Sequence, residues 1–596
     1  MEFPIETRRH SGAHVLAAAV QRLFPNAKFG VGPVIEHGFY YDIDIGRPVT
    51  LDDQAAIVAE MKRLVKEGSE FVREEMPIEN AIELFEKLGQ TYKVELLRDL
   101  LERGTTKISV EEAGDIDPER PDTVSVYRMG PFVDLCRGPH VDRASQIGAW
   151  QLTKIAGAYW RGKEGNPQMQ RLYGLAFQTE SELKAHLRMV EEAEKRDHRK
   201  LGSQLDLFVF SELVGPGLPL WTPKGTLLRH LLDGFVWELR KARGYERVEI
   251  PHITKKELYE TSGHWEKFSE ELFHIQTREK HLFAMKPMNC PHHTQIYARR
   301  QHSYRELPQR YANTTMVYRD EQTGELSGLS RVRCITQDDA HVFCRRSQVK
   351  EEMLKIWDII ETFYAAVGFG DLQVRLSFHD PEKRSAYLGS DEMWSTAEEA
   401  LSNLAKERGA DAVVALGEAA FYGPKIDFVA KDSIGREWQI ATIQLDLNMP
   451  ERFDLFCINE QAEKERIVMI HAAIMGSIER FLSIYIEHTA GAFPLWLSPE
   501  QVRVLPVADR HIEFASALAA ELREAGLRVV VDETAESVGK KIRNAEKMKI
   551  PVMLVVGDKE ASGDVLTVRR YGLKDQESHE KDAFVKRLLD EIETRS

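Results

Sequence analysis

Residue types that can bind zinc occur in three stretches of the chain between residues 285 and 481. Residues 285–293 read MKPMNCPHH, with one cysteine and two adjacent histidines. Further along, TQDDAHVFC contains His341 and MIHAAIMGSIERF contains His471. Zinc prefers thiolate sulfur and imidazole nitrogen, and a zinc ion that acts on a substrate keeps one position open beside three protein ligands. The question is whether one stretch forms a metal site alone or several form it together.

The adjacent histidines, His292 and His293, do not complete a site with the cysteine before them. Neighbouring side chains on an extended chain point to opposite faces, so both imidazoles rarely reach one ion. Residues 331–344, RVRCITQDDAHVFC, raise the same difficulty. If they form a strand, its period of two puts His341 and the closing cysteine on opposite faces, so that pair fails as well.

The face of this predicted strand that carries His341 is polar. Its members are Arg331, Arg333, Ile335, Gln337, Asp339 and His341. A buried core strand would not carry arginines, an amide and a carboxylate, whereas a strand with a solvated face could look the same. Both interpretations therefore stay open for this stretch taken alone.

The third stretch predicts a buried strand followed by a helix. Residues 467–470 are apolar, and the strand is expected to end at His471. Gly476 then leads into a helix that carries Arg480. A lone histidine after an apolar strand is more often structural than a ligand, and the same holds for a lone arginine in a helix.

A second group of candidate ligands lies nearer the N-terminus. His10 and His14 are four residues apart, which places them on one face of a helix. DLCRGPHV supplies Cys136 and His140 at the same spacing. Taken alone, this group is typical of a zinc site.

Composition limits the class of protein. The chain has 596 residues, 43% hydrophobic and 29% charged, with a net charge of −15 that would repel nucleic acid unless local basic surfaces bind it. Its five cysteines are odd in number and sparse, which predicts a reducing cytoplasm. No secretion signal or long apolar run occurs, so we expect a cytoplasmic protein and no membrane partner.

The order of predicted elements indicates several domains, because the chain is too long for one core. Short β-like runs and helices alternate first, then comes a charged helix, then a large block rich in β-like runs. The last hundred residues alternate strands with helices over 510–525 and 537–548, as in a small α/β module. The predicted boundaries are 1–180, 181–204, 205–494 and 495–596.

Together, MNCP, TQDDAHVFC and MIHAAIMGSIERF resemble the core of threonyl-tRNA synthetases, a family of class II aminoacyl-tRNA synthetases. The resemblance runs over essentially the whole chain and implies an α+β multidomain protein. Its parts would be an α+β editing domain, a linker helix, a class II catalytic core built on an antiparallel sheet, and an α/β anticodon-binding domain. Many family members begin with a small β-grasp domain, and this chain is expected to start directly at the editing domain.

The resemblance also selects the metal ligands. The family's zinc ligands match Cys290, His341 and His471, with one Zn²⁺ per subunit. His292 stands where the family usually has glycine and is not among them. Threonine and valine are isosteres that a hydrophobic pocket separates poorly, whereas an open-sided zinc can bind the amino group and the hydroxyl together.

The implied amino-acid pocket lies beside the metal. Asp339 shares a strand face with His341 and would accept the hydrogen bond of the threonine hydroxyl. The resemblance adds Gln337, Tyr422 and Gln444 to this pocket.

Adenylation brings two anions together, the threonine carboxylate and the α-phosphate of ATP, so cationic side chains and Mg²⁺ are needed. Arg319 matches the arginine that bridges the two, and Arg480 matches the arginine that covers the adenine. The other implied ATP contacts are Glu321, Arg331 and Gln439, with Lys425 as a further contact. The resemblance thus implies Arg319, Arg480 and Lys425 as the catalytic residues. The helix around 226–243 resembles motif 1, which forms the dimer interface, so a homodimer is expected.

Three positions depart from the family's pattern. Ile335 replaces a phenylalanine that stacks under the adenine, so we expect weaker ATP binding. Ala441 stands where glycine is usual, and Ala535 where asparagine often contacts the anticodon.

Serine fits the zinc site because it keeps the hydroxyl, and one missing methyl group discriminates by only about 1–3 kcal/mol. A second, hydrolytic site is the usual remedy. The resemblance implies that the N-terminal cluster is this editing site, with His10 as a base-type group. Its residues are His10, His14, Lys93, Asp134, Cys136 and His140. Related alanyl editing domains bind zinc with this set, so a metal stays an alternative to the positioning of water.

The C-terminal module carries a local basic run, GKKIRNAEKMK, at 539–549. A solvated helix face would look the same. The resemblance places anticodon contacts at Arg543, Glu560 and Arg569.

The sequence thus predicts a threonine–tRNA ligase that activates L-threonine with ATP, charges tRNA(Thr) and hydrolyses seryl-tRNA. One alternative is a catalytically inactive, RNA-binding or regulatory paralogue, which would be free to lose the metal ligands and motif arginines. Another is a class II ligase for a different amino acid, such as serine. The metal ligands and the motif arginines are all present, which disfavours the paralogue, and the ligand trio together with Asp339 disfavours a ligase for another amino acid.

Overall fold

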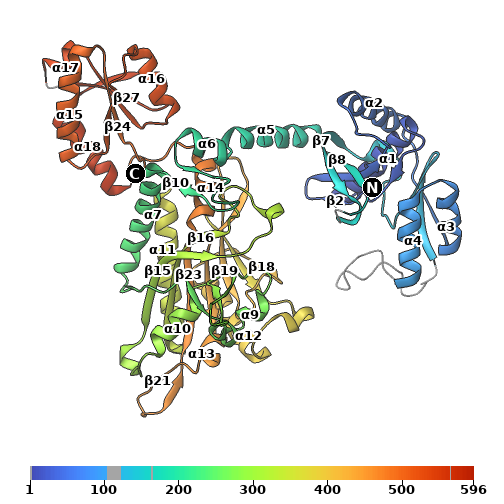
Figure 1. The fold of residues 1–596 in the computed structure, drawn as a ribbon, viewed down its shortest axis with the longest axis horizontal. Coiled ribbons are helices and arrows are strands. Elements are labelled where there is room, and N and C mark those ends of the chain that lie inside the picture. The colour runs from blue at the N-terminus through green and yellow to red at the C-terminus, as the bar shows by residue number, and fades with distance from the viewer. Residues whose placement is uncertain (1–2, 104–122, 163–164, 564, 596) are drawn as a thin grey trace. The chain divides into compact units, whose positions relative to one another are not determined.

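A computed structural model describes residues 3–103, 123–162, 165–563 and 565–595. The chain divides into two compact units, Met1–Glu191 and Glu192–Ser596, whose elements are labelled in Figure 1. Within the described residues, no helix is both long and apolar enough to cross a membrane.

The first unit is built around a buried helix. Helix α1 (Ile5–Leu23) packs against strands β3 and β8 of a sheet with the order β1-β3-β8-β7. Every residue from Ser11 to Val20 is buried, because glycine, serine and alanines let the helix approach its neighbours closely. The sheet strands are β1 (Lys28–Phe29), β2 (Val34–Ile35), β3 (Gly38–Asp44), β7 (Ala149–Tyr159) and β8 (Gln168–Phe177).

A second, three-stranded sheet completes this unit. Its order is β4-β5-β6, and helix α3 packs on β4 and β5. The elements are α2 (Leu51–Glu67), β4 (Val72–Pro77), α3 (Ile78–Lys87), α4 (Thr91–Arg103), β5 (Thr123–Met129) and β6 (Phe132–Leu135). Short strands and helices thus alternate, as expected for an α+β domain.

The connecting segment is two helices rather than the single helix predicted over 181–204. Helix α5 (Glu180–Arg196) ends before Asp197, and α6 (His198–Gln204) begins after it. The Asp197 carboxylate accepts a hydrogen bond from the Arg199 backbone N–H at 2.8 Å. This cap satisfies an amide at the start of α6 and separates the two helices.

The second unit contains an eight-stranded, largely antiparallel sheet with the order β11-β15-β16-β23-β20-β19-β17-β18. Helices α7 (Pro223–Lys241), α11 (Val349–Ala366) and α14 (Ile478–Thr489) bury apolar residues against it in the largest hydrophobic core. The strands are β11 (Glu246–Arg247), β15 (Gln309–Tyr318), β16 (Cys334–Cys344), β17 (Gln373–Phe378), β18 (Ala412–Leu416), β19 (Lys425–Lys431), β20 (Glu437–Asp446) and β23 (Val468–Ser477).

Two predicted strand limits were wrong. Strand β16 begins at Cys334, so Arg331 and Arg333 lie in the loop before it, where the Arg333 N–H donates to Gly217 O at 2.8 Å. Strand β23 does not end at His471 but continues to Ser477, because the next residues are also apolar and pair with β16 and β20.

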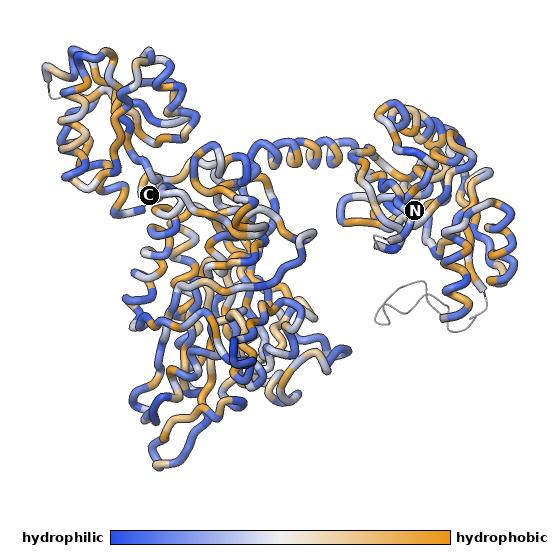
Figure 2. The backbone as a smooth tube through the Cα atoms, in the orientation of Figure 1, coloured by the Kyte–Doolittle hydropathy of each residue, from blue (hydrophilic) through white to orange (hydrophobic). Residues whose placement is uncertain are grey.

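The C-terminal module is a five-stranded sheet with the order β25-β24-β26-β27-β28. Hydrophobic residues concentrate in its central strands (Figure 2), which share the core of the module with the helices that cover the sheet. The predicted helices are α15 (Ile512–Glu524) and α16 (Val538–Lys547). The other elements are β24 (Val502–Pro506), β25 (Val529–Val531), β26 (Val552–Val556), α17 (Asp558–Ala561), β27 (Val565–Arg570), β28 (Gln576–Glu580) and α18 (Lys581–Thr594). The predicted α/β module is confirmed.

Candidate functional site

The three predicted zinc ligands meet in the second unit. Cys290 begins helix α10 (Cys290–Ala298), while His341 and His471 lie directly opposite each other on β16 and β23. All three are buried, and their candidate ligand atoms lie within 4.8 Å of one another. His341 Nε2 is 3.0 Å from His471 Nδ1. One sulfur and two nitrogens at this separation fit the ligand set of a single zinc ion.

The outer nitrogen of each imidazole already has a partner. His471 Nε2 lies 2.9 Å from Asp446 Oδ2, so it carries a proton and leaves Nδ1 with a lone pair that faces His341. His341 Nδ1 lies 2.8 Å from His293 Nδ1. Outer contacts of this kind fix the ring orientation of imidazoles that bind metals.

The assumption of an extended chain around the two adjacent histidines was wrong. His292 and His293 lie in helix α10, where side chains three apart share a face, so His293 turns toward His341. His292 is buried, and neither of its ring nitrogens has a hydrogen-bond partner among the described residues.

Burial sets the protonation of His341 and Cys290. It lowers the pKa of His341 well below the usual value, which keeps a lone pair available. Burial also raises the pKa of the Cys290 thiol well above its usual value. A metal that binds here must therefore displace the thiol proton, as zinc does when a thiolate becomes its ligand.

The predicted amino-acid pocket lies on β16, β20 and the turn before β19. Gln444 pairs with His471 across the sheet, and the Tyr422 hydroxyl donates to Gln444 Oε1 at 2.5 Å. The Tyr422 ring stacks on the His471 ring with centroids 4.9 Å apart. Asp339 accepts from Asn289 Nδ2 at 3.1 Å. These contacts place Asp339, Tyr422 and Gln444 around the trio.

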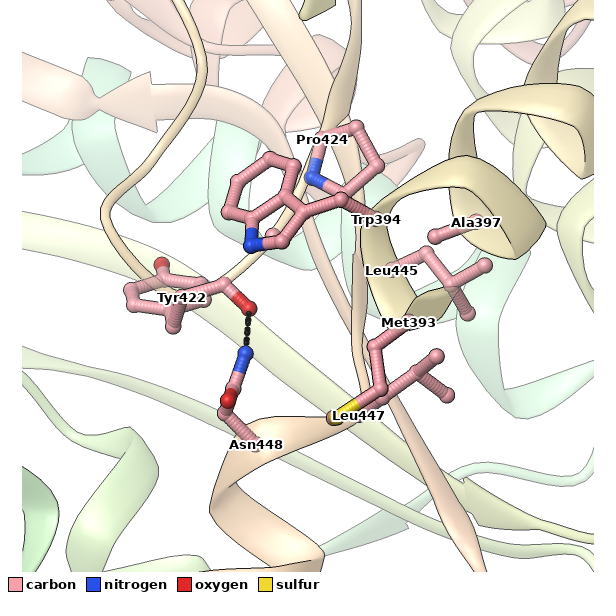
Figure 3. Close-up of a pocket in the computed structure, with 9 residues that line it drawn as sticks. Met393, Trp394, Ala397, Tyr422, Pro424, Leu445, Leu447 and Asn448 are labelled. Atoms are coloured by element: carbon pink, nitrogen blue, oxygen red, sulfur yellow. Dashed lines mark hydrogen bonds between the residues drawn. The ribbon is translucent and has the colours of Figure 1, made fainter. Parts of the chain in front are cut away.

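Tyr422 lines a small pocket whose other side chains are mostly apolar. Asn448 Nδ2 donates to the Tyr422 carbonyl at 2.7 Å (Figure 3). Trp394, Pro424 and Leu445 line the same small pocket. The stacking on His471 and the bond from Asn448 to the Tyr422 backbone orient the Tyr422 hydroxyl toward Gln444.

The predicted ATP residues form two clusters. In the loop between β15 and β16, Arg331 Nε donates to Glu321 Oε2 at 2.7 Å, and the Arg319 N–H donates to Arg333 O at 3.0 Å. The other cluster shares Asp427, since Lys425 Nζ lies 3.1 Å from its Oδ2 and Gln439 Nε2 donates to its Oδ1 at 2.7 Å. Arg480 is exposed in the first turn of α14.

Two atoms in these groups lack partners. The Arg319 Nε and Gln337 Oε1 atoms are buried without a hydrogen bond among the described residues. Buried polar atoms without partners are uncommon in folded proteins. Both belong to residues that the sequence assigns to substrates, so a polar ligand would satisfy them.

Sequence reasoning missed two buried side chains beside the trio. His264 is fully buried, with Nε2 3.8 Å from Cys290 Sγ, and burial lowers its pKa to about 3. Lys286 is also fully buried, with Nζ 3.0 Å from Thr315 Oγ1, and burial lowers its pKa to about 8. Lys286 lies in the MKPMNCPHH stretch, so a lysine beside the candidate ligands could have been noticed in the sequence. His264 lies outside every motif and could not.

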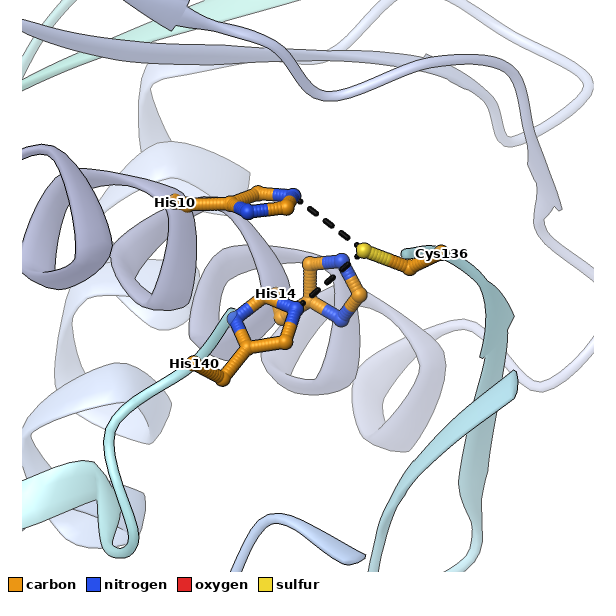
Figure 4. A group of neighbouring side chains, drawn as sticks. All are labelled: His10, His14, Cys136 and His140. Carbon is orange, nitrogen blue, oxygen red and sulfur yellow. Dashed lines mark hydrogen bonds between the residues drawn. The ribbon is translucent and has the colours of Figure 1, made fainter. Parts of the chain in front are cut away.

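The N-terminal cluster also assembles (Figure 4). Helix α1 presents His10 and His14 on one face, as predicted, and the segment after β6 supplies Cys136 and His140. Cys136 Sγ lies 3.2 Å from His10 Nε2 and 3.3 Å from His140 Nε2. The thiol carries one proton, so it can donate to one of these imidazoles at a time.

The cluster is neutral. Burial lowers the pKa of His10, His14 and His140 and raises the pKa of the Cys136 thiol to about 12. On the far side of His140, Ser11 Oγ lies 3.1 Å from Nδ1. The Ser11 hydroxyl donates to Thr7 O at 2.7 Å, so it accepts from a protonated His140 Nδ1.

A charged pair lies next to these imidazoles. Lys93 Nζ is 2.5 Å from Asp134 Oδ1, and His14 Nε2 is 3.4 Å from Asp134 Oδ2. Tyr41, which sequence reasoning missed, donates its hydroxyl to Asp134 and accepts from Lys93 Nζ at 3.2 Å. All four side chains are buried, so the pair is a fixed ion pair in the wall of the cluster.

The predicted anticodon residues differ in availability. Arg543 is exposed on α16. Arg569 on β27 lies 3.4 Å from Glu546. Glu560 is buried, and its carboxylate accepts from the Thr567 hydroxyl at 2.6 Å and the Gly557 N–H at 2.8 Å. Ala535 is exposed.

Three family models match the chain. Residues 273–489 match the class II tRNA synthetase core domain (G, H, P, S and T), and residues 501–591 match an anticodon-binding domain. Residues 124–173 match the second additional domain of threonyl- and alanyl-tRNA synthetases.

Curated relatives match over nearly the whole chain. The threonine–tRNA ligase of Gloeobacter violaceus is 48% identical over 94% of this chain and 88% of its own length. That of Phocaeicola vulgatus is 46% identical over 98% of this chain and 88% of its own length.

Solved structures of threonyl-tRNA synthetases are similar to about two thirds of this chain. The RNA-binding domain of threonyl-tRNA synthetase from Cryptosporidium parvum is 38% identical with a TM-score of 0.63, over 66% of this chain and 98% of its own. A putative threonyl-tRNA synthetase from Aeropyrum pernix is 32% identical with a TM-score of 0.60, over 67% of this chain and 97% of its own.

Proposed function

The chain belongs to the threonine–tRNA ligase family, and from that premise we propose which parts of it carry each step. Residues 205–494 activate L-threonine with ATP and transfer it to tRNA(Thr). Residues 1–180 hydrolyse seryl-tRNA, 181–204 connect the two, and 495–596 bind the anticodon. The observation that carries the proposal is the convergence of Cys290, His341 and His471 beside Asp339.

Cys290, His341 and His471 would hold one Zn²⁺ per subunit. When bound, the ion supplies an open position for the amino group and hydroxyl of threonine. Asp446 orients His471 through Nε2, and His293 orients His341 through Nδ1, so both imidazoles keep their inner nitrogens directed at the site.

Asp339 distinguishes threonine from valine. Its buried carboxylate has Asn289 on one oxygen and can accept the threonine hydroxyl on the other. Valine brings no donor and leaves a buried carboxylate unsatisfied, which is the strong form of rejection. Tyr422, Gln444 and Gln337 complete the polar lining around the amino acid.

Adenylation joins a threonine carboxylate oxygen to the α-phosphorus of ATP and releases pyrophosphate, with Mg²⁺ accompanying the nucleotide. Arg319 bridges the two anions, which is supported by its unpartnered buried Nε. The further ATP contacts are Glu321, Arg331, Gln439, Lys425 and Arg480. Ile335 packs on the adenine without stacking.

The N-terminal cluster positions a water molecule for hydrolysis of seryl-tRNA. His10 and Cys136 are its more exposed members, so the water and the tRNA end approach from their side. His10 accepts the proton of the attacking water, and the Lys93–Asp134 pair fixes the opposite wall. A metal in this cluster is the alternative, and metal analysis of the C136S variant distinguishes the two.

Two further proposals concern macromolecular partners. Arg543 and Arg569 contact the anticodon of tRNA(Thr), with Glu560 shaping the surface from below. The chain forms a homodimer through α7 and its neighbourhood. An exposed apolar segment supports this, since Leu213 is 99% exposed and Val209 and Phe210 are about half exposed.

ATP–pyrophosphate exchange with threonine, serine and valine, combined with metal analysis, tests the proposed function. We expect exchange with threonine and with serine, none with valine, and one zinc per chain. Absence of exchange with threonine would contradict the proposal and favour a catalytically inactive paralogue.

A further inference from the structure

A histidine in the connecting segment contacts the predicted ATP-binding loop. His198 begins helix α6 and is 6% exposed. Its Nδ1 lies 2.6 Å from Glu487 Oε1, and its Nε2 lies 3.0 Å from the backbone nitrogen of Leu329. Leu329 belongs to the loop between β15 and β16. Neither the sequence pattern nor the proposed steps of activation and hydrolysis give His198 a role.

The hydrogen bonds define the protonation of this imidazole. A backbone N–H can only donate, so the Leu329 amide requires an unprotonated Nε2. Nδ1 then carries the proton and donates a hydrogen bond to Glu487, because a carboxylate can only accept one. Arg436 donates to the other oxygen of Glu487 at 2.6 Å and holds that carboxylate in place.

These bonds exclude a metal at the same residues. Asp197, His198 and Glu487 bring candidate ligand atoms within 4.8 Å of one another. Yet both nitrogens of His198 are engaged, and the Asp197 carboxylate binds the backbone and guanidinium of Arg199. No lone pair of the imidazole is left for an ion, so this group is a hydrogen-bond relay.

The loop is packed tightly on the ring. Leu329 is fully buried, and Gly328 has a φ of +49°. A Cβ at position 328 would lie 2.3 Å from His198 Nε2, so only glycine lets the backbone approach this closely. The turn that follows is closed by the Ser327 N–H, which donates to Arg331 O at 3.1 Å.

The geometry points to His198 as a positioning residue for the ATP-binding loop, with Nε2 fixing the Leu329 amide and thereby the direction of Arg331 and Glu321. Arg331 follows Leu329 within the same closed turn and pairs with Glu321 at 2.7 Å. This inference rests on the proposed role of those two side chains in binding ATP.

The anchor of this contact is the end of the connecting helix. Arg196, the last residue of α5, donates to Ser433 Oγ at 2.6 Å and to His488 O at 3.3 Å. His198 follows two residues later and is bonded to Glu487, the neighbour of His488. The helix end, α14 and the loop are therefore joined by side chains whose positions depend on one another.

Two substitutions separate the halves of the relay. In H198Q the amide reaches the position of Nε2, and its oxygen can accept from Leu329. In H198N the shorter amide can donate to Glu487 but does not reach Leu329. We expect H198N to raise the KM for ATP about fivefold, the equivalent of one hydrogen bond, with kcat and the KM for threonine little changed. H198Q should stay near wild type.

The loop offers an independent variant. G328A pushes the backbone away from the ring and should also raise the KM for ATP. It provides the same test of the contact if H198N does not fold. Combined with H198N it should add less than its single effect, because both remove the same contact.

Three outcomes would overturn the positioning role. One is an unchanged KM for ATP in H198N and G328A, another is an equal rise in the KM for threonine, and the third is an H198Q variant as impaired as H198N. A wild-type chain without any exchange activity would instead contradict the proposed function, and this inference with it.

Discussion

The two units each contain a group of cysteine and histidine side chains, and the groups differ in what surrounds them. Both bring candidate ligand atoms within 4.8 Å. In the second unit, a carboxylate and an imidazole hold the outer nitrogens of His471 and His341. In the first unit, the Cys136 thiol lies between two imidazoles, and a hydroxyl, Ser11 Oγ, contacts the outer side of one.

This difference indicates that closeness of ligand atoms does not by itself define a metal site. The outer partners decide which nitrogen keeps a lone pair and how firmly the ring is held. A carboxylate partner makes His471 a stronger donor, whereas the serine hydroxyl beside His140 adds no charge. The comparison therefore predicts zinc at Cys290, His341 and His471 in the second unit, and water at the N-terminal group in the first unit.

The largest expected effect separates the two cysteines. C290S should remove zinc from the chain and lower threonine-dependent exchange more than about 100-fold, since a metal ligand is lost. C136S is the matched control and should leave zinc content and exchange unchanged. Metal analysis and exchange assays on both variants check this. Loss of zinc in C136S would show that the N-terminal group binds the metal.

Removal of His10 should disable hydrolysis without touching activation. H10A is expected to slow hydrolysis of seryl-tRNA by about 100-fold, the usual contribution of a positioned base. Its exchange activity with threonine should equal that of wild type. H37A, an exposed histidine of the same unit, is the control. Hydrolysis at the wild-type rate in H10A would exclude His10 as the base.

Outer contacts should matter more for the zinc ligands than for the N-terminal group. D446N removes the charge beside His471 and should weaken zinc binding about 10–100-fold. S11A removes the hydroxyl beside His140 and should slow the hydrolysis of seryl-tRNA by less than about 10-fold. Competition with a chelator and a seryl-tRNA hydrolysis assay give the two values. Equal effects would remove the distinction drawn between the groups.

The last prediction concerns the pH dependence of stability rather than activity. Burial lowers the pKa of His10, His14 and His140, whereas in the unfolded chain their pKa is about 6.5. The unfolded state thus binds more protons, and stability that is present above pH 6.5 is lost as the pH falls below it. Each histidine contributes up to about 1.4 kcal/mol per pH unit.

Hydrogen exchange of helix α1 between pH 7 and pH 5, corrected for the intrinsic rate, measures this loss. H140Q should reduce the slope, because one titrating group is gone. A slope that is unchanged in H140Q would contradict a neutral, buried His140.

The amino-acid sequence by itself determined the residue types, the order of domains and the local elements. Helical spacing placed His10 and His14 on one face, and the structure confirms it. The alternation of strands and helices after residue 495 predicted the α/β module for the same reason, since hydrophobic periodicity is a local property. Resemblance to a family supplied the zinc trio, which spacing alone had left open.

Only the tertiary structure decided which side chains meet and how their hydrogens are arranged. His341 and His471 are 130 residues apart and become neighbours through strand pairing. Tyr41, His264 and His198 gave no signal in the sequence, because their roles depend on partners supplied by distant segments. The predicted end of β23 at His471 was wrong for the same reason, since pairing with β16 and β20 extends the strand beyond that residue. Contacts between distant residues depend on the packing of the whole sheet, which no local pattern encodes.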